Sequence, residues 1–447
     1  MNSLDQYIEL YLEHRDIVDS HSAPVLNRLR PEALEVLERS RLPHKGDEGY
    51  ERTSVDDMFA PDFGVNISRM PVEADLAATF KCDVPNMSTL LGITLNDTFH
   101  PSATLVKRLP EGVIFTSLRE AAEKHPELVE RYYGSLAPLT EAAVALNTLL
   151  AQDGVMIYVP RGMKLDRPLQ LVNIFCSREP VMAVRRVLVV IEEGAEAQIL
   201  VCDHTQPEAG ASLSSQVVEI AVGRNARLDY CDMEESTSAT SRHSRMFVRQ
   251  EADSYLNFNG ITLSCGNTRN DYSIDLTAPG CETRLSGMVI GSDRRHADNN
   301  SVVRHLAPRC KSNQLFKYVL DDDSTGAFEG SILVAPGAQH TEAYQSNRNI
   351  LAAPGARMHT RPQLEIYNDD VKCSHGATTG QLDDEALFYM RTRGIPEREA
   401  RVMLMQAFMT DVIDSVGIEG LRDRLRHLVE RRFAGVSATC GDCPVNS

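Results

Sequence analysis

The sequence lacks the long apolar segments that anchor a protein in a membrane or direct it out of the cell. No run of about eighteen apolar residues occurs in the chain. The N-terminus, MNSLDQYIELYLEHRD, carries charged residues every few positions, where a secretion signal has a continuous apolar core. We therefore expect a cytoplasmic protein without a membrane partner.

Motifs of several common enzyme classes are also missing. There is no G-x-x-x-x-G-K-[ST] phosphate loop, and the nearest imitation, Gly376 to Gly380 followed by Gln381, has no lysine to reach a phosphate. Neither a G-x-S-x-G elbow nor an H-E-x-x-H helix occurs. We expect no nucleotide site and no catalytic residues, so that the chain is not itself an enzyme.

Positive charge is scarce as well. The 46 Lys and Arg residues against 63 Asp and Glu residues leave a formal net charge of -17. Proteins that grip a phosphate backbone use clustered basic residues, so we expect no nucleic-acid partner.

The ten cysteines, scattered from Cys82 to Cys443, lack the two separate C-x-x-C pairs of a structural zinc site; Cys440 and Cys443 make only one such pair. In a reducing compartment most of them should be buried small apolar residues rather than disulfides. Cys440 and Cys443 fall in a polar segment, which predicts a flexible tail over residues 436–447.

What the sequence does contain is three regions of different periodicity. Residues 1–153 are predicted to be mainly helical: Leu4, Tyr7 and Tyr11 recur at helical spacing, and Gly154 closes the last helical segment. Residues 154–380 consist of short β-branched and aliphatic runs separated by Gly, Asn, Asp and Pro. Residues 381–435 return to a helical pattern.

The middle region carries a weak internal repeat. Its anchor leucines are separated by 28, 28, 29 and 30 residues: Leu200, Leu228, Leu256, Leu285 and Leu315. A repeat of this length predicts stacked coils that bury a common apolar face, so we predict a right-handed parallel β-helix. A β-sandwich or barrel is the alternative, because short strands at regular spacing are typical of those folds too. The fold class is α+β, with the β-helix between N-terminal and C-terminal helices.

In the C-terminal region, Gly394 is predicted to stop one helix and Pro396 to open the next. The second helix carries one apolar stripe: Ala400, Met403, Leu404, Ala407, Phe408 and Val412. This stripe can pack on the end of the solenoid or dock a partner.

The segment NDDVKCSHGATTG carries the most informative local chemistry. Residues i and i+2 of a strand point to the same face, so Cys373 and His375 should project together, with Ser374 opposite. A thiolate and an imidazole suit iron or iron–sulfur species, although a Cys-x-His pair is weak support for a metal site. Four further histidines are more simply explained by hydrogen bonding at the surface or between coils: His296, His305, His340 and His359.

Three stretches resemble the SufB/SufD family of SUF iron–sulfur cluster assembly proteins. They are LNTLLAQDGVMIYVPRGMKLDRPLQL from Leu146, the segment from Ser324 to Ile395, and EREARVMLMQAFMTDVI. The segment CSHGAT at Cys373 resembles the SufD branch, whereas SufB proteins carry an H-E-A-T-T-S type segment there.

The resemblance implies a SufB–SufC–SufD type complex in which the β-helices of SufB and SufD pair and SufC ATPase subunits dock on the C-terminal helices. It implies that His375, with a SufB cysteine, helps to build a nascent iron–sulfur cluster at that interface; the role of Cys373 is less defined. A homodimer in the absence of SufB is a further expectation. The alternatives are a carbohydrate-active β-helix enzyme and a self-associating structural solenoid.

Overall fold

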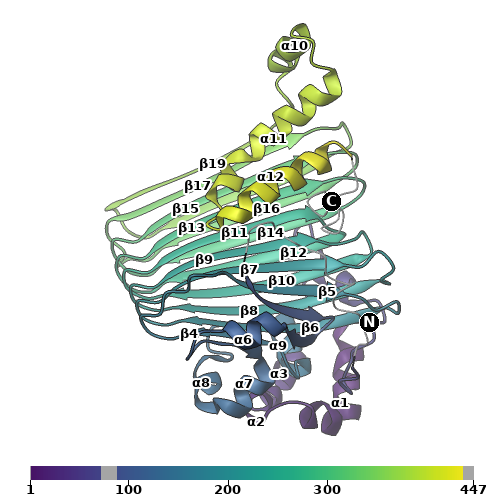
Figure 1. The fold of residues 1–447 in the computed structure, drawn as a ribbon, viewed down its shortest axis with the longest axis vertical. Helices are drawn as coiled ribbons and strands as arrows, with labels where there is room; N and C mark the ends of the chain where they lie inside the picture. Colours follow the sequence, from purple (N-terminus) through teal and green to yellow (C-terminus); the bar gives the residue numbers. More distant parts are fainter. Residues whose placement is uncertain (1, 72–87, 436–447) are drawn as a thin grey trace.

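The strands of the chain wind into a flattened parallel solenoid made of two sheets (Figure 1). The computed structural model describes residues 2–71 and 88–435. One sheet has the order β19-β17-β15-β13-β11-β9-β7-β5-β1-β2 and the other β18-β16-β14-β12-β10-β8-β6-β4-β3. We call them the odd-numbered and the even-numbered sheet after their solenoid strands, although β2 belongs to the first and β3 to the second. The solenoid strands are β4 (Val155–Val159), β5 (Leu169–Phe175), β6 (Val181–Ile191), β7 (Glu196–Thr205), β8 (Ser212–Val222), β9 (Arg227–Glu235), β10 (Thr240–Gln250), β11 (Tyr255–Ser264), β12 (Asn267–Leu276), β13 (Glu282–Gly291), β14 (His296–His305), β15 (Lys311–Leu320), β16 (Thr325–Val334), β17 (Thr341–Leu351), β18 (Arg357–Ile366) and β19 (Val371–Gly380).

Successive strands alternate between the sheets, and from β4 onward each pairs in parallel with the strand two positions later. Antiparallel pairs occur only at the first edge among the described residues, where β1 (Leu90–Leu95) meets β2 (Thr98–Pro101) and β3 (Ile114–Ser117) meets β4. The predicted α+β class with a parallel β-helix core is thereby confirmed, and the sandwich alternative is wrong.

The alternation of side chains explains why these short runs form coils. In β6, Val187, Val189 and Ile191 belong to the cluster inside the solenoid, whereas Leu188 and Val190 pack outward against the N-terminal helices. The turns between strands use asparagine and aspartate in the left-handed region, as at Asn225 (φ 55°) and Asp322 (φ 51°). These two residue types tolerate that conformation best after glycine.

The leucine repeat predicted the coil length correctly but not every side-chain direction. Leu228, Leu256 and Leu285 lie in the interior cluster. Leu200 and Leu315 instead face outward, toward the C-terminal helices. The interior position opposite Leu228 is Ala197, three residues before Leu200, and an odd shift along a strand turns a side chain to the other face.

The N-terminal helices cover the start of the solenoid and the outer face of the even-numbered sheet (Figure 1). They are α1 (Leu4–Ser20), α2 (Pro24–Asn27), α3 (Arg30–Leu37), α4 (Val55–Phe59), α6 (Ala103–Arg108), α7 (Leu118–Lys124), α8 (Pro126–Tyr132) and α9 (Ala142–Leu150). The expected mainly helical region also contributes β1, β2 and β3, which extend the two sheets.

Gly154 does not close a helix, because α9 ends at Leu150 and Ala151 caps it. Its role is close approach: a Cβ at this position would lie 2.1 Å from the carbonyl oxygen of Arg186. The glycine therefore lets the chain enter β4 against the backbone of β6.

The C-terminal helices are α10 (Asp384–Thr392), α11 (Glu397–Ser415) and α12 (Glu419–Phe433). Gly394 has the positive φ of 86° expected of a helix stop. Helices α11 and α12 lie on the outer face of the odd-numbered sheet, and α10 projects beyond the body of the molecule (Figure 1).

No helix among the described residues is long and apolar enough to cross a membrane. The division of the chain at residues 153, 380 and 435 stays a prediction. Cys82, Cys440, Cys443 and the predicted tail lie outside the described residues.

Candidate functional site

The last coil of the solenoid, β18 and β19, is open at its outer side. β19 is the final strand of the odd-numbered sheet and pairs with β17, while β18 is the final strand of the even-numbered sheet. Every residue from Ser374 to Gly380 is exposed. An exposed strand edge is a template for pairing with another chain, so this end is a natural assembly surface.

Cys373 and His375 lie on β19 and face the interior side of this open coil. Their Cα partners on β17 are Ala343 and Gln345, which are both buried, whereas the partner of Ser374 is the exposed Tyr344. Strand register therefore places the thiol and the imidazole on one face and the hydroxyl of Ser374 on the other.

The two side chains have different surroundings. Cys373 is half-buried against a small apolar cluster that includes Ile332, Val334 and Ala343, and burial raises the pKa of its thiol. His375 is exposed at the solenoid end. In this chain alone the imidazole is thus the more available ligand, and the thiol is held largely protonated at neutral pH.

The solenoid interior beneath His375 is polar rather than apolar. Gln345 Nε2 donates to Gln314 Oε1 at 3.3 Å, and Asn347 Nδ2 donates to the carbonyl oxygen of Phe316 at 3.3 Å. The side-chain oxygens of Gln345 and Asn349 have no partner although they are buried. Sequence patterning gave no signal for this polar floor, because Gln and Asn in a strand usually indicate its solvent face.

Within the described residues, no three His, Cys, Asp or Glu side chains come together as a metal-binding group. Cys373 and His375 can supply at most part of a ligand set. An iron–sulfur species at this edge needs further ligands from another molecule.

The other histidines singled out from the sequence occupy separate places. The His296 ring lies 2.8 Å from Thr53 Oγ1, and the His305 ring lies 2.8 Å from Ser312 Oγ inside the solenoid. Burial lowers the pKa of His305 to about 4. His340 pairs with Asp370 at 3.0 Å, and His359 lines a cleft beside Arg361. The hydrogen-bonding interpretation is confirmed for His296 and His305.

The C-terminal helices form a second candidate surface. Helix α11 packs on the sheet through Met405, Met409, Val412 and Ile413. The stripe predicted from the sequence is only partly buried: Ala400 and Val412 are buried, Leu404 and Phe408 are half-buried, and Met403 and Ala407 are exposed. The side of α11 that packs is therefore rotated about the helix axis from the predicted stripe. The outer face of the sheet, rather than a second helix, determines which side chains of α11 are buried.

Large apolar side chains remain uncovered on these helices. Phe388 is 69% exposed, Tyr389 59% and Met403 43%. Met403 also borders a groove of about 480 Å³ between α11 and α12, lined by Ala407, Arg426 and His427 among others. Uncovered aromatic residues such as the two on α10 are typical of protein-binding surfaces.

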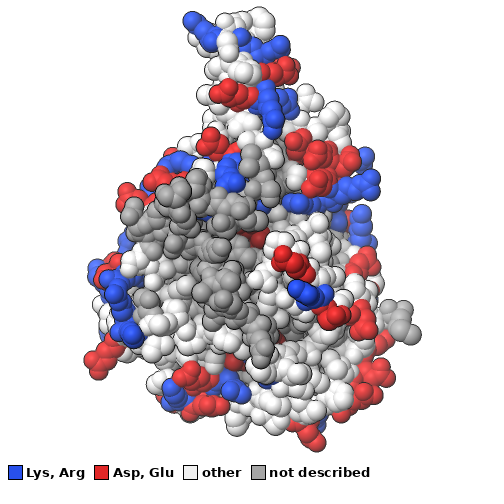
Figure 2. Space-filling model, turned by 45° about the vertical axis from the view of Figure 1, so that its right-hand side comes forward, with Lys and Arg blue, Asp and Glu red and all other residues white. Residues whose placement is uncertain are grey.

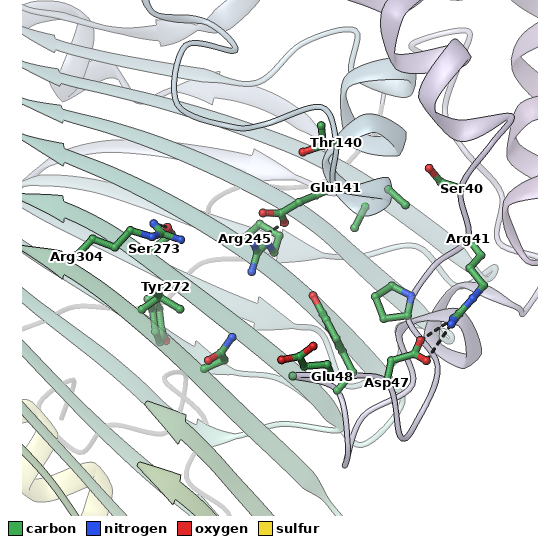
Figure 3. A pocket seen from close by; sticks show the side chains of 17 residues that line it. Ser40, Arg41, Asp47, Glu48, Thr140, Glu141, Arg245, Tyr272, Ser273 and Arg304 are labelled. Atoms are coloured by element: carbon green, nitrogen blue, oxygen red, sulfur yellow. Dashed lines mark hydrogen bonds and ion pairs between the residues drawn. The ribbon is translucent and has the colours of Figure 1, made fainter. Parts of the chain in front are cut away.

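Three arginines line the cleft between the N-terminal segment and the even-numbered sheet (Figure 3). It has a volume of about 620 Å³. Arg41 pairs with Asp47 at 2.6 Å and Arg304 with Asp275 at 2.9 Å, and Arg245 pairs with Glu141. These three arginines are already neutralised, so they do not mark an anion site. On the face shown in Figure 2, basic side chains are interspersed with acidic ones.

Comparison with known proteins gives a consistent result. A family model described as SUF system FeS cluster assembly, SufBD core domain, matches residues 174–408, and a SufBD protein N-terminal region model matches residues 1–171. An iron–sulfur cluster assembly SufBD family protein of Synechocystis is 28% identical over 430 residues, covering 94% of each chain.

Two similar relatives carry the name iron–sulfur cluster assembly protein SufD. The one from Escherichia coli is 30% identical over 300 residues, which cover 66% of this chain and 70% of the relative. The one from Bacillus subtilis is 24% identical over 423 residues, which cover 93% of this chain and 95% of the relative.

Proposed function

We propose a scaffold role for this chain, which belongs to the SufBD family of SUF-system iron–sulfur cluster assembly proteins. In this role the chain is a SufD-type subunit that performs no catalysis itself. It pairs with SufB through the open end of its solenoid, binds the SufC ATPase on its C-terminal helices, and presents His375 to a nascent cluster at the interface with SufB.

The position of His375 on the open edge strand carries the proposal. One side of β19 is bonded to β17, and the other side has no strand neighbour within the described residues. A second β-helix that continues the stack would satisfy the free backbone groups of β19 and β18. It would also cover the polar floor around Gln345 and Asn349, and its polar groups could supply partners for their buried side-chain oxygens, which have none among the described residues.

The chemistry of the edge fits a transient ligand. The imidazole of His375 is a borderline ligand for iron, and Cys373 two residues away is a soft one. Iron and sulfide are the substrates here, and the incomplete ligand set favours a cluster that is shared with SufB and then released. A chain that held a complete set would retain its product.

The C-terminal helices suit a partner that moves. Phe388 and Tyr389 lie on α10, which projects away from the solenoid, and Met403 lies on α11. Helix α11 in turn rests on β13 and β15. We propose that nucleotide-driven motion of SufC reaches the solenoid through these helices and opens the SufB interface. A cytoplasmic location remains a prediction.

The test is co-expression with SufB and SufC, followed by measurement of iron and acid-labile sulfide per purified complex. His375→Ala should assemble the complex but lose cluster, because an exposed strand residue costs only about 0.5 kcal/mol of folding free energy. Ser374→Ala is the matched control on the same strand and opposite face, and it should keep full cluster content.

Cys373→Ala separates two versions of the site. Equal loss of cluster in this variant indicates that the strand face works as a pair, and unchanged content assigns the role to His375 alone. Thermal unfolding of the same samples checks stability. Full cluster content in His375→Ala, or loss that follows stability, counts against the proposal.

The open end also allows two copies of this chain to pair when SufB is missing. The same β18 and β19 edges would then meet across a two-fold axis. Sedimentation of the isolated chain with and without SufB measures this: a homodimer that SufB cannot displace would favour the structural, self-associating alternative.

A further inference from the structure

Small buried residues form a column along one edge of the solenoid, where each odd-numbered strand begins. Each follows a residue of positive φ, such as Gly280 (φ 79°) or Arg309 (φ 60°). Strand register stacks them directly on one another, and each is at most 1% exposed. The column consists of Ala195, Ala226, Ser254, Cys281, Cys310 and Thr341.

Cys281 and Cys310 are adjacent members of this column. They precede the register partners Glu282 and Lys311, and the amide of Lys311 donates to the carbonyl oxygen of Cys281 at 2.8 Å. Both sulfurs also lie against one oxygen, the carbonyl of Ala278, at 3.0 and 3.3 Å. The two thiols are therefore neighbours, although 29 positions separate them in the sequence.

The geometry of adjacent strands suits a disulfide. Neighbouring strands lie about 4.8 Å apart, inside the range of roughly 4.4 to 6.8 Å between the Cα atoms of bonded cysteines. The electrostatics agree with the geometry. A side-chain hydrogen bond from Cys310 lowers the pKa of Cys281 to about 7, and the same pairing raises the pKa of Cys310. The lowered pKa of Cys281 favours it as the attacking thiolate, with Cys310 as the resolving thiol.

We propose that Cys281 and Cys310 are a redox-active dithiol that oxidises to a disulfide across adjacent coils. With hydrogen peroxide as oxidant, the Cys281 thiolate attacks one oxygen, the O–O bond breaks, and a hydroxide ion departs. Cys281 is then a sulfenic acid. The Cys310 sulfur then attacks that sulfur, the S–O bond breaks, and water leaves as the S–S bond forms. The thiol proton of Cys310 completes the water of this second step, and the proton that Cys281 released on ionising neutralises the hydroxide of the first step, so two thiols and one peroxide give one disulfide and two waters.

The dithiol is separate from the proposed scaffold role, but a disulfide at this place would affect the mechanics of the solenoid. Strands β13 and β15 begin one residue after these cysteines, and α11 rests on both strands. A bond between Cys281 and Cys310 would tie the two coils that carry α11, and it would close a loop of about 30 residues in the unfolded chain. The oxidised chain should therefore unfold at a higher temperature than the reduced chain.

The test uses the full chain, reduced with dithiothreitol, freed of reductant and exposed to graded hydrogen peroxide or diamide. Remaining thiols are alkylated in denaturant and the peptides are mapped by mass spectrometry. The expected product is one linked peptide pair containing Cys281 and Cys310, lighter by two hydrogen atoms and separated again by dithiothreitol. Its yield should follow the rise in unfolding temperature.

Two variants and an internal control complete the design. Cys281→Ser and Cys310→Ser should fold, because Ser254 occupies the same column position, and each should abolish both the linked peptide and the temperature difference. Cys202 and Cys231 are buried on the neighbouring strands β7 and β9, but Cys231 is the partner of Leu200, so they should stay reduced.

Full alkylation of Cys281 and Cys310 at every oxidant concentration, including samples warmed to just below unfolding, would overturn the proposal. A bond from either cysteine to a different one would do the same. Mapping by peptide keeps oxidation of the remaining cysteines distinct from this outcome.

Discussion

Lys317 of β15 forms an ion pair with Asp411 of α11, with 2.6 Å between Nζ and Oδ2. The lysine side chain is only 3% exposed, whereas that of the aspartate is 59% exposed. Nζ also donates to the carbonyl oxygen of Phe408 at 2.7 Å and lies 4.8 Å from the centre of the Phe408 ring. A buried lysine of the solenoid thus binds α11, the helix that we propose transmits the motion of SufC.

Asp411→Asn should destabilise the chain by about 1–3 kcal/mol, because it leaves a buried ammonium without a counter-charge. Chemical denaturation of the full chain measures the change. Asp414→Asn is the control: it breaks the pair between Asp414 and Arg426, both about half exposed, and should cost less than about 1 kcal/mol. Equal costs for the two variants would mean that Lys317 finds another partner.

Glu234, inside the solenoid, should make stability depend on pH. Burial raises its pKa from 4.5 to about 7. Between these values the folded chain holds a proton that the unfolded chain has released, so the stabilising contribution is complete below about pH 4.5 and is lost as pH rises to 7. Glu234→Gln cannot ionise and should flatten this slope in unfolding measured from pH 5 to 8. An unchanged slope would assign the dependence to other groups.

Phe388→Ser and Tyr389→Ser should each weaken SufC binding by about tenfold or more without changing the unfolding temperature, because exposed aromatic residues at interfaces often contribute about 1–2 kcal/mol. Calorimetric titration with SufC provides the affinities. Leu306→Ser is the matched control, since Leu306 is 42% exposed but lies on the solenoid away from these helices. If both aromatic variants bind SufC with wild-type affinity, SufC docks on a different surface.

Gly154→Ala should destabilise the fold by about 1–3 kcal/mol, because the added methyl group meets the backbone of β6 rather than a side chain that can turn away. Gly337→Ala meets nothing within 4 Å and should stay within about 0.5 kcal/mol of the parent. Thermal unfolding compares them. If Gly154→Ala is as stable as the parent, the backbone just before β4 can shift to make room for the methyl group.

Much of this architecture is predictable from local pattern. A spacing of 28 to 30 residues between leucines predicts the coil length, because each coil needs the same two strands and turns. The spacing of Cys373 and His375 predicts a shared strand face, which the register with Ala343 and Gln345 reproduces. Gly394 predicts the end of α10 because few other residues adopt its backbone angles.

The remaining features depend on contacts across the sequence. Leu200 and Leu315 point outward, and α11 packs through Met405 rather than Met403, because register and the facing sheet select the buried side. Cys281 and Cys310 become neighbours only when β13 and β15 pair, and the polar floor under His375 forms only when β15, β17 and β19 stack. The sequence by itself determined the period, the strands and the residue chemistry; the tertiary structure decided which side chains meet, because inter-strand pairing joins residues that local propensity cannot relate.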